Sequence, residues 1–375
     1  MFAVVGGRLS AQWRGQVAAL DGAAQFECRD AAGKIAPDGL HRFGRALTHE
    51  AALAHSLQWL QNHAAGAQLV AAGHRIVHGG GLFARPVLLG QIERAALQRL
   101  VPLAPLHQPH NLAGVDAVAR LLPRLPQIGC FDTAFHATIP DVASTLALPQ
   151  TLRAQGLRRY GFHGLSYEHV AAAIRTRLPR SKRARVIAAH LGNGASLCAL
   201  KDGKSIDTTM GFSTLDGLVM GTRPGSIDSG ALLYLLRQKK LDAAALEDLL
   251  YRGSGLIGLS GLSADMRALE ASPDPRARFA IDVFVYRLVQ HIGAMAATLG
   301  GLDALIFTGG IGEKSALVRG RVCAALGWLG VKLDAAANGA HAPRISAARA
   351  KVTVLIVPAD EEGVIARQML ALLRG

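Results

Sequence analysis

Apolar segments along the chain run directly into glycine-rich turns, and they alternate with longer segments of helical periodicity. The apolar segments of strand length are residues 68–77, 186–191, 304–308 and 352–357. Apolar residues recur at helical spacing over residues 50–62, 112–122, 166–178 and 278–299. Alternating strands and helices predict an α/β fold, with a boundary near residues 139–140 where this alternation is interrupted.

Length and composition fit a folded globular protein of more than one domain. At ~150 residues per domain, 375 residues give two to three domains. Hydrophobic residues make up 50% and charged residues 18%, which excludes a disordered or fibrous chain. The longest charge-free apolar stretch, residues 288–302, is shorter than the ~20 residues that a membrane span needs. Because the N-terminus also lacks a signal-peptide pattern, we expect a cytoplasmic protein without a membrane partner.

The cysteines and the charge say little about function by themselves. Cys28, Cys130, Cys198 and Cys323 form no C-x-x-C pair, so we interpret them as small core residues. The formal charge of +14 admits nucleic acid or acidic small molecules as partners. Part of it lies in one stretch, with Arg153, Arg158, Arg159, Arg175, Arg177, Arg180, Lys182, Arg183 and Arg185. A solvated basic face is the favoured interpretation, because no aromatic platform or nucleic-acid motif accompanies these residues.

Two glycine-rich turns are candidates for a nucleotide site. Residues 190–196 and 307–313 each follow an apolar strand, and glycine there exposes backbone N–H groups to an anion. A tight turn between two elements needs glycine as well, so either turn alone is weak evidence. The chain contains neither a G-x-x-x-x-G-K-[ST] loop nor a Rossmann fingerprint, so a different ATP-binding fold is required.

Several longer motifs carry a resemblance to a known family. They are residues 74–80, 104–111, 131–136, 160–164, 210–212, 221–225, 260–267 and 360–362. In order and spacing they resemble the acetate kinase family, from about Phe2 to the C-terminus. The resemblance implies a two-lobed, actin-like ATPase fold of duplicated βββαβαβα topology with the active-site cleft between the lobes. Residues 1–138 would form the first lobe, with a helix at 364–375 packing back on it, and residues 139–363 the second lobe, which binds nucleotide and dimerises.

The family's reaction is the reversible, direct in-line transfer of the ATP γ-phosphoryl group to acetate or propionate, which gives the acyl phosphate and ADP. The resemblance further implies Mg²⁺ (or Mn²⁺), a homodimer and no nucleic-acid partner. Transfer to a carboxylate needs no base, because the nucleophile is already ionised, but it brings two anions together. Arginine suits such a site, because its guanidinium fork binds carboxylate and phosphoryl oxygens in bidentate fashion.

The resemblance assigns the following roles. Asp132, His163 and Arg223 are catalytic, and Arg75, Val77, Leu106, His107 and Phe162 bind substrate. His190, Gly192, Asn193, Gly194, Asp265, Met266, Arg267, Gly310, Ile311, Gly312, Glu313 and Lys314 bind nucleotide, and Glu361 binds the metal. Each role has a structural alternative: core packing for the apolar residues, loop clamps for the arginines, a satisfied histidine for His107 and a solvated carboxylate for Glu361.

The chain departs from the family pattern at a few positions. Thr214 stands where the family has a small apolar residue or proline in the acyl pocket, so acetate and propionate both remain open. Lys314 replaces an asparagine beside the nucleotide, and Ser226 and Ser229 replace an aspartate and a proline. The family's first strand and N-x-G-S-S-S-x-K loop have no counterpart before Phe2. A catalytically weak or silent nucleotide-binding homologue is therefore the alternative to an acetate kinase, and a nucleic-acid-binding protein is the third hypothesis.

Overall fold

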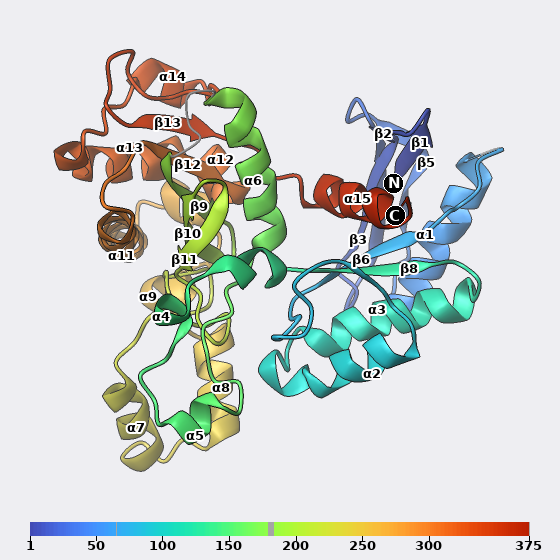
Figure 1. Ribbon diagram of the computed structural model, residues 1–375, viewed down its shortest axis with the longest axis horizontal. Coiled ribbons are helices and arrows are strands. Elements are labelled where there is room, and N and C mark those ends of the chain that lie inside the picture. Colours follow the sequence, from blue (N-terminus) through green and yellow to red (C-terminus); the bar gives the residue numbers. More distant parts are fainter. Residues whose placement is uncertain (65, 179–183, 375) are drawn as a thin grey trace. The chain divides into compact units, whose positions relative to one another are not determined.

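The computed structural model describes residues 1–64, 66–178 and 184–374. The chain forms two compact units, the first made of Met1–Phe131 with Glu361–Gly375 and the second of Asp132–Asp360 (Figure 1). The domain boundary expected from the sequence lies seven residues later, after residue 138. Each unit has its own sheets and helices.

The second unit is built on a five-stranded mixed sheet. Its strands are β9 (Arg185–Leu191), β10 (Ala195–Lys201), β11 (Lys204–Thr208), β12 (Ala304–Thr308) and β13 (Thr353–Ile356). Their order is β11-β10-β9-β12-β13, antiparallel from β11 to β9 and parallel from β9 to β13. Three antiparallel strands are therefore followed by two parallel strands, as one βββαβαβα repeat requires. The predicted strands at 186–191, 304–308 and 352–357 are confirmed to within a residue at either end.

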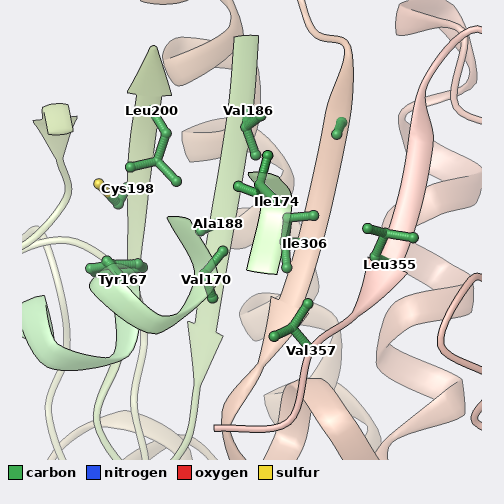
Figure 2. Packing of buried hydrophobic residues seen from close by; sticks show 11 residues of the cluster. Tyr167, Val170, Ile174, Val186, Ala188, Cys198, Leu200, Ile306, Leu355 and Val357 are labelled. Atoms are coloured by element: carbon green, nitrogen blue, oxygen red, sulfur yellow. The ribbon is translucent and has the colours of Figure 1, made fainter. Parts of the chain in front are cut away.

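Two long helices supply much of the packing in this unit. α6 (Gly164–Arg177) places Tyr167, Val170 and Ile174 against buried residues of β9, β10 and β12 (Figure 2). The remaining helices are η2 (Ala134–Thr138), α4 (Asp141–Ser144), α5 (Gln150–Arg153), α7 (Ser229–Arg237), α8 (Ala243–Arg252), α9 (Gly255–Ser260), α10 (Met266–Ala271), α11 (Pro275–Leu299), α12 (Gly309–Lys314), α13 (Ala316–Ala325), η3 (Gly327–Leu329) and α14 (Ala335–Gly339).

α11 begins three residues before the predicted start at residue 278. The Asp274 carboxylate accepts a hydrogen bond from the Arg276 N–H, Pro275 occupies the first helical position, and Gly300 ends the helix at a φ of 70°. By length and composition alone this helix could cross a membrane, and 44% of its most apolar window is buried. Since it packs against β9, β10 and α9, the structure accounts for it as a core helix of this unit.

The first unit contains three small sheets. β1 (Phe2–Val5) and β2 (Arg8–Ala11) form a hairpin, and β3 (Trp13–Ala18), β4 (Gln25–Asp30) and β5 (Ile35–Arg42) form an antiparallel sheet. The third sheet has the order β6-β8-β7, from β6 (Ala72–Ile76), β8 (Gln127–Phe131) and β7 (Val87–Leu88). The predicted strand at 68–77 is too long, because β8 begins opposite Ala72 and the preceding residues have no strand beside them.

Helices of the first unit cover these strands. They are α1 (His49–His63), α2 (Gln91–Arg99), η1 (Val101–Leu103), α3 (Gln108–Leu121) and α15 (Glu361–Leu372). α15 packs tightly on β6, since a Cβ at Gly73 would clash with the Met369 sulfur. All four cysteines of the chain are buried, as predicted.

Candidate functional site

The turn between β9 and β10 lies at the centre of the candidate site in the second unit. The N–H of Gly192 donates to the carbonyl of Gly194 at 3.0 Å, which closes the turn. A Cβ at Gly194 would lie 3.0 Å from Arg223 Nη2 and 3.3 Å from His163 Nε2. Two predicted catalytic groups therefore converge on a backbone position that carries no side chain.

His163 is held in an unusual backbone conformation at the start of α6. Its φ of 59° lies in the left-handed region, which a residue other than glycine adopts at a cost of about 1–3 kcal/mol. The ring stacks on that of His190 with 4.2 Å between centroids. Nδ1 of His163 lies 2.8 Å from Ser196 Oγ, and Nδ1 of His190 lies 2.8 Å from Ser166 Oγ. Both predicted histidines are thus oriented through their Nδ1 atoms.

Arg223 belongs to a loop that is anchored by backbone hydrogen bonds. Its Nη1 donates to the Thr214 carbonyl at 2.9 Å, and burial lowers the pKa of its guanidinium, which stays protonated at neutral pH. The N–H of Gly221 donates to the Asn193 carbonyl at 3.0 Å, which joins the Arg223 loop to the glycine turn. On the other side, the N–H of Ser254 donates to the Thr222 carbonyl at 3.0 Å.

The second glycine-rich turn follows β12 and continues into α12. Gly309 has a φ of 76°, and a Cβ there would lie 2.9 Å from the Leu191 carbonyl oxygen. Glu313 Oε1 accepts from the N–H groups of Gly309 at 3.0 Å and Ala359 at 2.9 Å. Glu313 therefore clamps the turn, while Gly310 and Lys314 are exposed beside it.

A buried arginine that the sequence analysis missed supports the same turn. Arg319 is fully buried, and its Nη1 donates to the carbonyls of Gly312 at 2.9 Å and Glu313 at 2.8 Å. Its Nε donates to Asn338 Oδ1 at 2.8 Å. The segment Ala316–Ala325 also contains the partly exposed Arg321, so the sequence alone does not indicate which of its two arginines is buried.

The predicted nucleotide-binding residues 265–267 begin α10. The Asp265 carboxylate accepts from the Arg267 N–H at 3.0 Å and pairs with the Arg267 guanidinium at 2.7 Å. Met266 is buried. A Cβ at Gly221 would lie 3.2 Å from the Ala264 carbonyl oxygen, so this segment adjoins the Arg223 loop.

The first unit brings together two residues predicted for different roles. Arg75, in β6, lies 3.4 Å (Nε to Oε2) from Glu361, the first residue of α15. The segment after β6 is fixed by α3, since Val77 N–H donates to Asn111 Oδ1 at 2.9 Å and Gln108 Nε2 donates to the His78 carbonyl at 3.0 Å. Neither amide side chain was predicted to support the site, although both lie in the motif at 104–111.

The remaining predicted residues differ in burial. Val77 in the first unit and Phe162 in the second are buried, whereas Leu106 and His107 are half-buried. Asp132 in the second unit is 1% exposed, and its carbonyl accepts from the Gly164 N–H at 2.8 Å.

His136 is a further residue that the sequence analysis left without a role. Its Nε2 lies 2.9 Å from the Phe162 carbonyl oxygen, and its Nδ1 lies 2.8 Å from Ser205 Oγ. Complete burial lowers its pKa to about 4, and burial lowers the pKa of His78 in the first unit to about 4 as well. His136 is therefore neutral and bonds the backbone directly before His163.

Part of the basic stretch is structural rather than a solvated face. Arg159 donates to the Thr208 carbonyl at 2.6 Å, and Arg185 pairs with Asp303 at 2.6 Å. Arg175 is exposed. Arg180, Lys182 and Arg183 lie outside the described residues.

No group of three or more His, Cys, Asp or Glu side chains is arranged to hold a metal ion among the residues that the structure describes. Mg²⁺ does not need such a group, since one or two carboxylates with phosphate oxygens and water suffice. Glu361, with a side chain that is 21% exposed, fits this requirement.

Comparison with known proteins decides the family. A model of the Acetokinase family matches residues 29–367. The chain belongs to the acetokinase family. It is 51% identical to an acetate kinase of Methylocella silvestris over 325 residues, which are 87% of this chain and 80% of that protein. It is 44% identical to an acetate kinase of Rhizobium meliloti over 373 residues, which are 100% of this chain and 94% of that protein.

Solved structures of the family agree with the fold. The Porphyromonas gingivalis acetate kinase matches with a TM-score of 0.87 and 36% identity, over 99% of this chain and 95% of that one. A Francisella tularensis propionate kinase matches with a TM-score of 0.89 and 31% identity, over 96% and 93%. The two-lobed, actin-like α/β fold and the phosphotransferase class are thereby confirmed. Nothing in these comparisons supports the alternative of a catalytically silent homologue.

The two buried histidines predict how stability depends on pH. The unfolded chain takes up protons on His78 and His136 below about pH 6.5, whereas the folded chain does so only near pH 4. The free energy of unfolding should therefore fall by about 1–2 kcal/mol per histidine between pH 7 and pH 5, as denaturant titrations can measure. His136→Gln replaces the ring N–H by an amide N–H that does not titrate, so it should weaken the dependence of the free energy of unfolding on pH. An unchanged pH dependence in that variant would contradict the assignment.

Proposed function

We propose that this chain is an acetate kinase that transfers the γ-phosphoryl group of ATP directly to acetate and gives acetyl phosphate and ADP. The observation that carries the proposal is the convergence of Arg223 and His163 beside Gly194. Both side chains can donate hydrogen bonds to phosphoryl oxygens, and the glycine leaves room for the group that is transferred. The reaction is reversible, and the protein acts in the cytoplasm.

The chemistry assigns a task to each charged group. The acetate carboxylate is already ionised, so no general base is needed, and the barrier arises from bringing two anions together. Arg75 would bind the carboxylate as a bidentate partner. Arg223 and His163 would stabilise charge on the equatorial oxygens of the phosphoryl group during in-line transfer.

The nucleotide is proposed to bind to the two glycine-rich turns and the loop that precedes α10. The backbone N–H groups of residues 193–194 and 310–312 would face phosphate and ribose, with the side chains of His190 and Asn193 beside them. Residues 265–267 and 310–314 would lie along the adenosine. The Glu313 carboxylate would support this site indirectly, because it holds the turn through hydrogen bonds from two backbone N–H groups.

Glu361 of the first unit is the proposed carboxylate for Mg²⁺. When bound, the metal would supply positive charge that neutralises part of the charge of the phosphate groups. Glu361 shares its charge with Arg75 across 3.4 Å, with both side chains partly exposed. Such an ion pair contributes about 0–1 kcal/mol to stability. Mg²⁺ can therefore replace Arg75 as the partner of Glu361, and the substrate carboxylate can replace Glu361 as the partner of Arg75.

Val77 and Leu106 of the first unit are proposed to contact the acyl group. Thr214 is buried in the second unit and carries a hydroxyl where the family has an apolar residue. In a pocket of apolar side chains, the one extra methylene of propionate changes the binding free energy by only about 1–3 kcal/mol. We therefore propose both acetate and propionate as substrates.

A homodimer through the second unit is supported by an apolar surface without a partner. None of the residues of α7 is buried, although the helix is rich in leucine. On α11, Phe279 is 57% and Tyr286 62% exposed, and their spacing of seven residues puts them on one face. α7 and α8 lie at one end of the unit, away from its sheet (Figure 1). A groove of about 350 Å³, lined in part by Ile227 and Val283, adjoins this surface.

Alanine at either proposed arginine tests the reaction. Arg223→Ala should lower kcat by a factor of about 10²–10³, since a lost transition-state contact costs about 3–4 kcal/mol. Arg75→Ala should act mainly by raising KM for acetate, and lysine should restore neither activity because it lacks the planar fork. Acetyl phosphate formation is measured by hydroxamate trapping with ATP, Mg²⁺ and acetate.

Arg175→Ala, at an exposed position of α6, is the matched control and should retain the rate of the unchanged protein. Rates close to that of the unchanged protein in both Arg75→Ala and Arg223→Ala would remove these arginines from the mechanism.

The dimer is tested by light scattering on a sizing column. Replacing Phe279 and Tyr286 together by glutamate should convert a dimer of about twice 39.4 kDa into a monomer, because buried charges oppose association. Ile92→Glu, at an 80% exposed apolar position of the first unit, should leave the dimer intact. A double variant that remains dimeric would place the interface elsewhere.

A further inference from the structure

A buried chain of three side chains leads from the core of the second unit to His163. Tyr167 and Ser196 are both fully buried, and the Tyr167 hydroxyl forms a short hydrogen bond with Ser196 Oγ. Ser196 Oγ in turn lies 2.8 Å from His163 Nδ1. The Tyr167 ring is part of the apolar cluster between α6 and β10, which fixes its position (Figure 2).

The direction of these hydrogen bonds follows from counting donors and acceptors. The Tyr167 phenol is fully buried, so its one hydrogen needs an acceptor inside the protein. Among the residues that the structure describes, Ser196 Oγ is the acceptor within reach of that hydrogen. Because Ser196 Oγ accepts the hydrogen bond from the Tyr167 hydroxyl, the Ser196 hydroxyl donates its own hydrogen to His163 Nδ1.

The alternative protonation states of His163 fit this network less well. A hydrogen on Nδ1 would make Tyr167 and His163 both donate to Ser196 Oγ, and in the described part of the chain no acceptor is then placed for the serine hydrogen. A doubly protonated ring would face the same conflict. It would also put a second positive charge beside the Arg223 guanidinium at Gly194.

We infer that Tyr167 and Ser196 are positioning residues that hold His163 as a neutral ring with its proton on Nε2. Nε2 is the atom near Gly194, so the hydrogen points toward the space where the phosphoryl group is proposed to pass. This inference rests on the proposed kinase function. It assigns the histidine the role of a fixed hydrogen-bond donor, oriented before the substrates bind.

The protonation state is measured directly by long-range ¹H–¹⁵N spectra of the full chain labelled at histidine. The nitrogens of His163 are assigned by their loss in His163→Gln. The unchanged protein should show a protonated Nε2 and an unprotonated Nδ1 at neutral pH. Tyr167→Phe, which keeps the ring in the core, and Ser196→Ala should each change this pattern to a mixture of states.

Kinetics supply the second readout. Tyr167→Phe should lower kcat about tenfold with KM for ATP and acetate within about twofold, since about 1.4 kcal/mol of transition-state stabilisation is lost. Tyr160→Phe is the matched control, because it removes a phenol that donates to the Gly156 carbonyl outside this chain of bonds. The control should keep both the His163 spectrum and kcat.

A hydrogen on Nδ1 in the unchanged protein, or an unaltered spectrum in both variants, would overturn the inference. The proposed function fails separately: a protein without kinase activity that still shows the Nε2–H state would contradict the kinase proposal and leave the role of Tyr167 and Ser196 in fixing the proton intact.

Discussion

The register between β9 and β10 is the constraint on which the candidate site of the second unit depends. His190 and Ser196 are directly opposed across the two strands, three residues before and three residues after Asn193. They are the two partners of His163, one through ring stacking and the other through a hydrogen bond. A shift of one residue would turn one partner to the opposite face of the sheet, so the glycine turn fixes the histidine by fixing the register.

α6 meets this hairpin with residues at helical spacing. His163 and Tyr167 lie four residues apart and therefore share a face of the helix, which lets both reach Ser196. Val170 and Ile174 extend the same side into the core cluster of the sheet. The apolar packing of α6 thus offsets the energetic cost of the unfavourable φ of His163. Glycine is required at position 164, because a side chain there would clash with the Asp132 carbonyl oxygen.

Local pattern in the sequence predicted the four longest helices, the strands β6, β9, β12 and β13 and the position of the glycine turns, but not the strands of the first 45 residues. Strands 186–191 and 304–308 and the helix near 166–178 were predicted because their periodicity is complete within each segment. The family resemblance then named His163, His190 and Arg223. What it did not name are residues whose importance comes from partners far along the chain, such as Ser196 and Arg319.

These missed residues share a physical reason. Arg319 is useful because Asn338, nineteen residues later, and two carbonyls of the preceding turn surround it, and no spacing rule encodes that arrangement. Glu313 was predicted as a nucleotide ligand, yet its carboxylate is engaged by two backbone N–H groups. Resemblance thus identifies which positions matter, whereas the contacts show whether a side chain is placed to meet a ligand or to hold the loop.

The central claim is that the space beside Gly194 has to remain empty for Arg223 and His163 to act on the same group. Steady-state kinetics of Gly194→Ala test it most directly, with Gly327→Ala as the control because no atom lies within 4 Å of a Cβ at that position. Gly194→Ala should lower kcat by at least about tenfold with an unchanged melting temperature, whereas the control should keep its rate. A Gly194→Ala protein with unchanged kcat and unchanged KM for ATP would contradict it.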